Sequence, residues 1–277
     1  MLFYGFAHKS TLTFDSTKWE GAKMPADITT IIGYQGLHHK NKQRRFLRKF
    51  IENIAKRSRE YSRLYLKEHG ILANGLLTGE RGSYSLMAAA MDRITPMHES
   101  EMSVKRRRAG RGKTTGKTGR VDLWSCFDGL EYFMEFKRSY TSANSIHDCV
   151  VTERVDDRWK SLKEQVDTAK RGVADNPDYK EFKDRTYVIG MHTITPYRTS
   201  TDREKIIESL GTDQFNPGIL QYWVQELSPE PDAVLVWKIA EEQHKFLPIS
   251  WDGDQETRWG AYPCHLFCFR IVRIDQG

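Results

Sequence analysis

Two acidic residues and a lysine lie on neighbouring segments whose spacing could bring them together. Two stretches rich in β-forming residues flank Asp128-Gly129, a dipeptide typical of two-residue hairpin turns. The register set by such a turn places Asp122 opposite Glu135. Lys137 follows Glu135 by two residues, so both side chains emerge on the same face of their strand. The hairpin is therefore expected to gather two carboxylates and an ammonium group.

This grouping suits a site for a hard cation. Opposed residues on paired strands have Cβ atoms roughly 4.5–5.5 Å apart, so two facing carboxylates repel each other unless something compensates their charge. Their neighbours are apolar, namely Val121, Leu123, Phe133 and Phe136. Carboxylate oxygens are ligands that Mg²⁺ prefers, and an ammonium group can orient or help to deprotonate a bound water. Hydrolysis of a phosphodiester bond suits such a set, because the metal stabilises the negative charge that develops on the phosphoryl oxygens.

The same residues resemble a known family. Asp122, a gap of twelve residues and then Glu135-Phe136-Lys137, on a strand–turn–strand unit followed by a helix, look like the PD-(D/E)XK nuclease superfamily. The resemblance covers roughly residues 75–195. It implies the restriction-endonuclease-like fold, an α/β fold with a central mixed β-sheet flanked by helices. It also implies cleavage of DNA with Mg²⁺, or with Mn²⁺ as a substitute, and 5′-phosphate products.

The resemblance assigns roles to further residues. Beside Asp122 and Glu135, it implicates the main-chain carbonyl of Phe136 as a metal ligand. Glu80 matches a glutamate that many members carry on the helix before the hairpin, where it reaches the metal directly or through water. Gln165, on the helix after the hairpin, matches a polar position that often completes the site.

Each of these residues also has an interpretation without chemistry. The two strand carboxylates could form a solvated ladder with Arg120 and Lys137. Glu80 could be an acid in the first turn of a helix, favoured there by the helix dipole. Gln165 could be an ordinary residue on a helix surface.

The positive charge of the chain is concentrated in two segments. The sequence has 43 Lys and Arg against 37 Asp and Glu, a net charge of +6. Residues 105–120 carry eight basic residues and no acid, and residues 40–67 carry eleven basic residues against two acids. Since the remainder is acidic, a polyanion contacted at defined places is the expected partner. The alternatives are a mobile loop and a solvated helix face. The residues expected to contact DNA are Lys105, Arg106, Arg107, Arg108, Arg111, Lys113, Lys117 and Arg120.

A nucleotide triphosphate is not expected as a ligand. Two Gly-Lys-Thr tripeptides, at residues 112–114 and 116–118, match part of a P-loop. The glycine that the motif requires five residues before each tripeptide is Arg107 in one frame and Arg111 in the other.

Composition excludes several classes of protein. A hydrophobic fraction of 39% with 12% aromatic residues is too high for a disordered chain, and no apolar run approaches the ~20 residues of a membrane span. The first ten residues lack the pattern of a secretory signal. The four cysteines form no CxxC pair, which favours a reducing, cytoplasmic location. Cys264 and Cys268 alternate on an apolar segment, so we expect core thiols and not zinc ligands.

The elements that must position these residues follow from periodicity and turn signals. Helices are predicted at 42–69, 79–93, 156–171, 203–210 and 218–227. Strands are predicted at 120–127, 130–139, 185–194, 233–239 and 266–274, with Glu101–Val104 as a candidate strand before the hairpin. No repeat and no long linker divides the chain. The expectation is one domain over residues 1–277, with a core at about 75–240 and N- and C-terminal elaborations.

The function expected from the sequence is that of a Mg²⁺-dependent deoxyribonuclease, an endonuclease that hydrolyses phosphodiester bonds with a metal-activated water. DNA is the expected partner, with a homodimer as one way to cut both strands. The alternatives are a non-catalytic nucleic-acid-binding protein that keeps the nuclease fold and an RNA nuclease. No membrane is expected as a partner.

Overall fold

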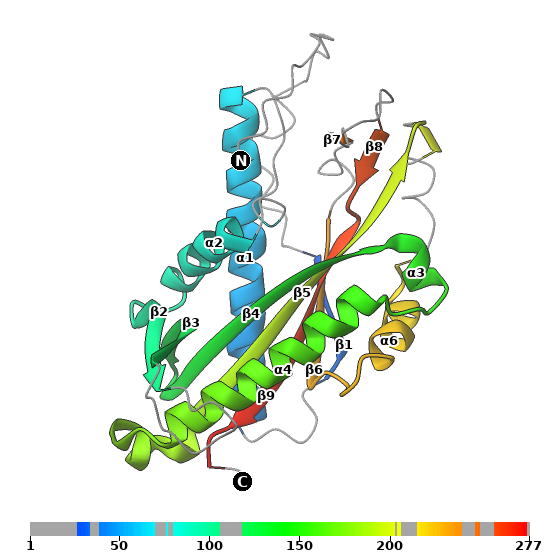
Figure 1. The fold of residues 1–277 in the computed structure, drawn as a ribbon. Helices are drawn as coiled ribbons and strands as arrows, with labels where there is room; N and C mark the ends of the chain where they lie inside the picture. The colour runs from blue at the N-terminus through cyan, green and yellow to red at the C-terminus, as the bar shows by residue number, and fades with distance from the viewer. Residues whose placement is uncertain are drawn as a thin grey trace.

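The chain forms an α/β structure in which helices cover a mixed sheet (Figure 1). The computed structural model describes residues 27–33, 39–69, 76, 80–105, 118–202, 204–205, 215–239, 247–249 and 258–275. Within these ranges, no helix combines the length and the apolar character needed to cross a membrane.

The described strands form one connected sheet. They are β1 (Asp27–Ile32), β2 (His98–Lys105), β3 (Thr118–Phe127), β4 (Leu130–Ser142), β5 (Thr186–Ser200), β6 (Ala233–Lys238), β7 (Leu247–Ile249), β8 (Arg258–Ala261) and β9 (Cys264–Arg273). Their order is β1-β6-β9-β5-β4-β3-β2, and β8, paired with β7, joins the end of β5. β4 and β5 run parallel, whereas the other neighbours run antiparallel. The parallel pair requires a crossover connection, which the helices between β4 and β5 provide.

The helices pack in two layers, one on each face of the sheet (Figure 1). They are α1 (Lys40–His69), α2 (Glu80–Asp92), α3 (Ala143–His147), α4 (Glu153–Ala174) and α6 (Pro217–Gln225), with the 3₁₀ helix η3 (Pro177–Arg185) before β5. The buried side chains of α1 and α2 form one hydrophobic cluster with the sheet. Those of α3, α4 and α6 form a second cluster on the opposite face.

Most of the predicted elements are present. Helices 42–69, 79–93, 156–171 and 218–227 are confirmed as α1, α2, α4 and α6, and the predicted strands as β3, β4, β5, β6 and β9. The candidate strand at Glu101–Val104 lies within β2. The predicted helix at 203–210 falls outside the described residues except for Glu204 and Lys205, which are helical.

The core extends on both sides of the segment 75–240. The C-terminal strand β9 lies between β5 and β6, in the middle of the sheet. On the N-terminal side, Phe46 and Phe50 of α1 are fully buried, and the ring of Phe46 stacks on that of Tyr132 at 4.0 Å between centroids. The segments outside 75–240 therefore supply a central strand and one wall of the core.

Two fully buried histidines lie in the central sheet, and one of them gives a test of acid stability. The ring Nδ1 of His265 on β9 lies 2.8 Å from Thr195 Oγ1. Burial, aided by the charge of Arg138, lowers the pKa of His265 to about 3. Between about pH 3 and the ordinary value of ~6.5, only the unfolded chain takes up this proton, so the free energy of unfolding falls as the pH falls.

We expect the variant His265→Gln to lose about 1.4 kcal/mol per pH unit of this acid dependence across pH 4 to 5.5. Denaturant titrations of wild type and variant at several pH values measure the difference. The lost hydrogen bond to Thr195 lowers stability at every pH. The readout is therefore the slope of the free energy of unfolding against pH, and not its value at any one pH. Parallel curves for the two proteins would contradict the prediction.

Candidate functional site

The hairpin that carries the candidate residues forms with the predicted register. Asp128 and Gly129 both have positive φ, 55° and 72°, as a type I′ turn requires. The pairing of β3 with β4 runs from Phe127↔Leu130 to Leu123↔Met134. The next pair in this register is Asp122 with Glu135, as the sequence predicted, but the regular ladder ends one step before it.

β3 leaves β4 at Asp122. In a continuous antiparallel ladder, the Phe136 N–H would donate to the carbonyl of Val121. Instead, it donates to Asp122 Oδ2 at 2.7 Å. The alternation of side chains also slips here, because Leu123 packs in the cluster under α1 and α2 whereas Val121 packs in the cluster under α4. The Asp122 carboxylate is thus held against the backbone of Glu135-Phe136-Lys137 at a break in the ladder.

Glu135 places a buried carboxylate beside this break. Its residue exposure is 3%, whereas Asp122 and Lys137 are half-buried. Burial disfavours a charged carboxylate, and a second carboxylate nearby disfavours it further unless positive charge compensates both. The structure therefore places the Asp122 carboxylate on the backbone next to Glu135, with Lys137 two residues further along β4.

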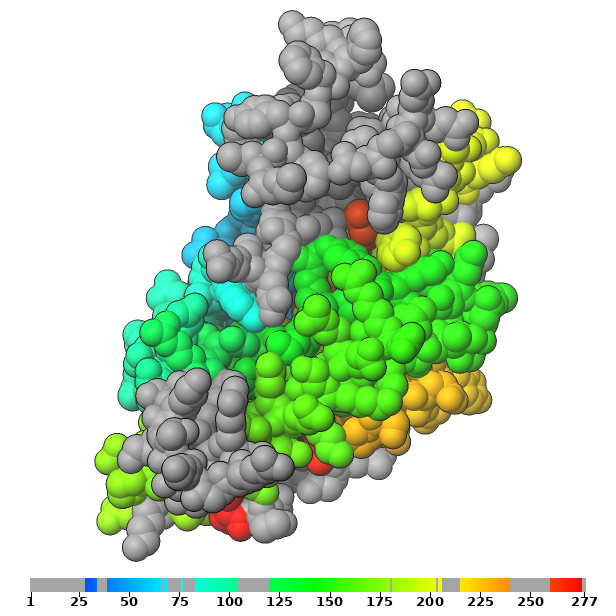
Figure 2. Space-filling view, in the orientation of Figure 1, coloured from blue at the N-terminus to red at the C-terminus, as the bar shows by residue number. Residues whose placement is uncertain are grey.

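Helix α4 closes the face of the sheet on which Glu135 lies. Glu135 pairs with Gly190 of β5, and a Cβ atom built on Gly190 would lie 2.7 Å from Val166 Cγ2 and 2.9 Å from Leu162 Cγ. α4 thus passes directly over this pair, and Figure 1 shows α4 lying across the sheet, with Figure 2 giving the space-filling view in the same orientation. Gln165 precedes Val166, and its Oε1 is buried without a hydrogen-bond partner. A buried amide oxygen without a hydrogen-bond partner can accept a hydrogen bond from a water or coordinate a cation.

Lys137 lies beside a buried histidine that the sequence did not single out. His192 pairs with Lys137 across β4 and β5, and its Nε2 lies 2.8 Å from Ser139 Oγ. Burial, aided by the charges of Arg158 and Lys137, lowers the pKa of His192 to about 3. His192 is therefore neutral near pH 7 and adds no positive charge to the site. Only the β4–β5 register brings His192 here, so no local sequence signal could have found it.

The structure places Glu80 at the first residue of α2 but does not describe its side chain. The first turns of this helix contact β4, where Arg138 Nη1 donates to Ser83 Oγ at 3.3 Å. The rings of Tyr84 and Phe136 lie 5.9 Å apart. α2 thus begins on the face of β4 opposite to Glu135, and a role for Glu80 stays a prediction.

Most of the predicted DNA contacts lie in the segment between β2 and β3. Residues 106–117, which include most of the predicted DNA contacts and both Gly-Lys-Thr tripeptides, lie outside the described residues. Lys105 pairs with Thr118 at the open end of these strands, about 13 Å along β3 from Asp122. Arg120 is exposed and donates to Glu101 at 2.8 Å.

Part of the basic face of α1 has a structural role. Lys42 Nζ donates to the carbonyl of Asp128 at 3.0 Å, and Arg45 pairs with the carboxylate of the same residue. Arg48 and Arg57 pair with glutamates of their own helix. The contacts of Lys42 and Arg45 hold α1 against the hairpin turn, a use of the charge that the sequence alone did not reveal.

The candidate metal ligands near the ladder break include only two acidic residues among the described side chains, Asp122 and Glu135. Among the described side chains, no group of three or more His, Cys, Asp or Glu residues is arranged to hold a metal ion. A metal site here would combine the two carboxylates with a main-chain or amide oxygen. Cys264 and Cys268 are buried in β9, as expected for core thiols.

Comparison with known proteins adds no relative: the chain matches no protein-family model, no curated protein and no solved structure.

Proposed function

We propose that this chain is a metal-dependent deoxyribonuclease with a restriction-endonuclease-like fold, a member of the PD-(D/E)XK superfamily. The observation that carries the proposal is the bond from the Phe136 N–H to Asp122 Oδ2, which places this carboxylate beside Glu135 and Lys137 at the ladder break. The order of elements supports it, because α2, β2, the β3–β4 hairpin and α4 follow one another as the resemblance implies. β2 supplies a strand between the helix of Glu80 and the strand of Asp122.

The donors around the ladder break fit Mg²⁺. They are all oxygens, one carboxylate is nearly fully buried, and the amide oxygen of Gln165 has no partner among the described residues. Asp122, Glu135 and the carbonyl of Phe136 would hold the ion, with Glu80 and Gln165 in support. When bound, Mg²⁺ lowers the pKa of a water and offsets charge on phosphoryl oxygens, and Mn²⁺ would substitute for it.

Side chains of the protein would position the attacking water and the DNA and would supply positive charge to the site. Lys137 emerges on the face of Glu135, where its ammonium group can orient the attacking water and donate to a phosphoryl oxygen. α4 packed over Gly190 excludes bulk water from this side, which strengthens each electrostatic interaction of the site. The basic loop between β2 and β3 would hold the DNA backbone near Asp122.

Cleavage assays test the proposal. Supercoiled plasmid, linear duplex and single-stranded RNA are incubated with the protein in Mg²⁺ and, as a control, in EDTA. We expect nicked and then linear DNA in Mg²⁺ alone. DNA binding without cleavage in Mg²⁺ or Mn²⁺ would favour a non-catalytic binding protein, and cleavage of RNA alone would favour an RNA nuclease. The homodimer and the cytoplasmic location also stay predictions.

The basic loop gives a separate prediction about DNA binding. Replacing its first four basic residues, Lys105, Arg106, Arg107 and Arg108, by glutamine should weaken binding and flatten its salt dependence. Each lost phosphate contact reduces the slope of log K against log salt by about 0.9, so the slope should fall by up to roughly 3.5. Fluorescence anisotropy across a salt series measures this slope, and thermal melting checks folding. An unchanged slope would show that the loop is only a connection.

A further inference from the structure

A second polar site lies at the carboxyl ends of the two parallel strands. β4 ends at Ser142 and β5 at Ser200, and a cavity of about 280 Å³ opens between their ends. This volume corresponds to roughly nine water molecules, enough for a phosphate group and an adjoining sugar. Its lining consists of Ser142, Asn144, Tyr197, Arg198, Thr199, Ser200 and Lys205.

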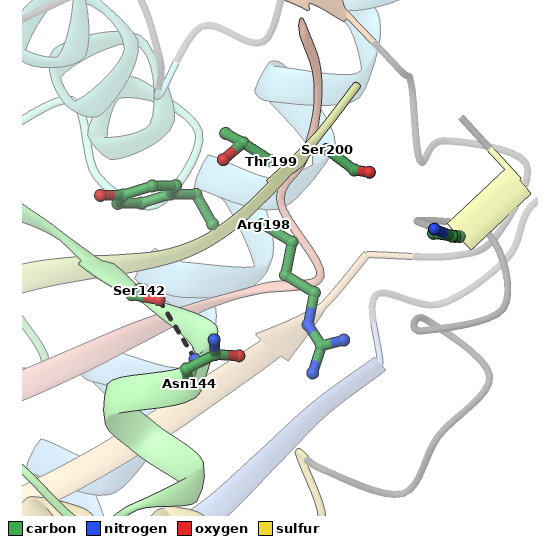
Figure 3. A pocket seen from close by; sticks show the side chains of 7 residues that line it. Ser142, Asn144, Arg198, Thr199 and Ser200 are labelled. Carbon is green, nitrogen blue, oxygen red and sulfur yellow. Dashed lines mark hydrogen bonds between the residues drawn. The ribbon is translucent and has the colours of Figure 1, made fainter. Parts of the chain in front are cut away.

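The chemistry of the lining favours an anion. Two residues carry positive charge, the others offer hydroxyl or amide groups, and none is acidic. Figure 3 shows the side chain of Arg198 extending from its strand toward Asn144. Ser142 Oγ already accepts from the backbone N–H of Asn144 at 3.2 Å. A phosphate oxygen accepts hydrogen bonds from guanidinium, ammonium, hydroxyl and amide groups alike.

Within the described residues, the partly buried charge of Arg198 has no anionic partner. Its Nε is buried without a hydrogen-bond partner, and no ion pair of Arg198 or Lys205 occurs in the described part of the chain. Burial lowers the pKa of the Arg198 guanidinium, which means that the site disfavours its charge. A bound anion would reverse this penalty, because it supplies both the opposite charge and the missing acceptor.

We propose that this pocket binds a phosphate group, and that in the complex with DNA this is a backbone phosphate remote from the scissile bond. The second half of this inference rests on the proposed nuclease function. Glu135 and Ser142 are seven residues apart on β4, at most about 23 Å. With 3.4 Å per base pair, this distance corresponds to about seven base pairs of B-DNA. The pocket would thus fix the direction of the duplex across the sheet.

Inorganic phosphate tests the pocket without DNA. We expect it to raise the melting temperature of the wild type and to broaden its own ³¹P resonance. Arg198→Gln and Lys205→Gln should each weaken the apparent affinity at least about tenfold, the amount expected for one lost charge-assisted contact. Arg171→Gln, at an exposed position in the last turn of α4, is the matched control and should bind as the wild type does. Equal phosphate binding by all four proteins would overturn the inference.

Duplex binding in EDTA tests the assignment to DNA. For a 30-base-pair duplex, Arg198→Gln should weaken binding about tenfold and lower the salt slope by about one, because one phosphate contact is lost. A six-base-pair duplex cannot span both sites, so Arg198→Gln should change its binding less than that of the 30-base-pair duplex. Lost phosphate binding with unchanged affinity for the long duplex would overturn the DNA assignment and leave free phosphate as the ligand. If the wild type binds phosphate but no nucleic acid, the proposed function fails while the phosphate pocket stands.

Discussion

Replacing Asp122 with asparagine is expected to lower the rate of Mg²⁺-dependent DNA cleavage by about 10²–10³-fold while the protein stays folded. A carboxylate that holds a catalytic cation contributes several kcal/mol to transition-state stabilisation, and each ~1.4 kcal/mol corresponds to a tenfold change in rate. The amide of asparagine has almost the same shape but no charge. Its oxygen can still accept the hydrogen bond that the Phe136 N–H now donates to Asp122 Oδ2 at 2.7 Å.

Because this hydrogen bond is retained, the substitution should change the cleavage rate much more than the stability of the fold. A hydrogen bond to a neutral acceptor is about 1 kcal/mol weaker than one to a carboxylate, so the melting temperature should fall by only a few degrees. Single-turnover cleavage of a labelled duplex measures the rate, and circular dichroism follows the melting transition. Lys137→Ala is expected to reduce the rate in the same way, because the water would lose its positioning group.

Asp157→Asn is the matched control. Asp157 is exposed on α4, so this variant has the same change of charge away from the ladder break. It should cleave DNA at the wild-type rate. If Asp122→Asn cleaved as fast as Asp157→Asn, the carboxylate would have no part in the reaction, and the site would have to be assigned elsewhere.

Replacing Gly190 with alanine is expected to destabilise the protein by about 1–3 kcal/mol and to slow cleavage as well. The new Cβ would lie 2.7 Å from Val166 Cγ2 and 2.9 Å from Leu162 Cγ, closer than carbon atoms can approach. Both atoms belong to side chains that are fully buried under α4, so the helix must shift away from the sheet. Because Gly190 pairs with Glu135, the shift acts directly on the wall of the candidate site.

Two measurements distinguish the effects of this substitution. Denaturant unfolding gives the loss of stability, and cleavage at a temperature where the variant is fully folded gives the effect on the site. A displacement of about 1 Å at the reacting groups can cost up to ~10²-fold in rate. Gly33→Ala is the control, since no atom of the described residues other than its chain neighbours lies within 4 Å of a Cβ built there, and it should stay within ~0.5 kcal/mol of the wild type. Equal stability and activity of the two variants would show that α4 need not pass so close to β5.

The local elements of this fold were predictable because neighbouring residues determine them. A turn at Asp128-Gly129 needs positive φ at both residues, and such a turn imposes the register of the strands on either side. Helix α1 was predictable because its apolar residues, Phe46 and Phe50 among them, recur with the helical period. The same turn sets the register that directs Asp122 toward Glu135, but the hydrogen bond from the Phe136 N–H to Asp122 Oδ2 replaces the last step of the ladder, which no local pattern indicated.

The sequence by itself thus determined the longer helices, the hairpin and the register that directs Asp122 toward Glu135 and Lys137. The tertiary structure alone decided which strands are neighbours. β5 lies parallel to β4, which brings Gly190 and His192 to the candidate site, and β9 enters between β5 and β6. The same parallel pair creates the pocket of Arg198 and Lys205 at its carboxyl end. Such pairings join residues tens of positions apart and depend on how helices cover both faces of the sheet, so no local pattern of side chains specifies them.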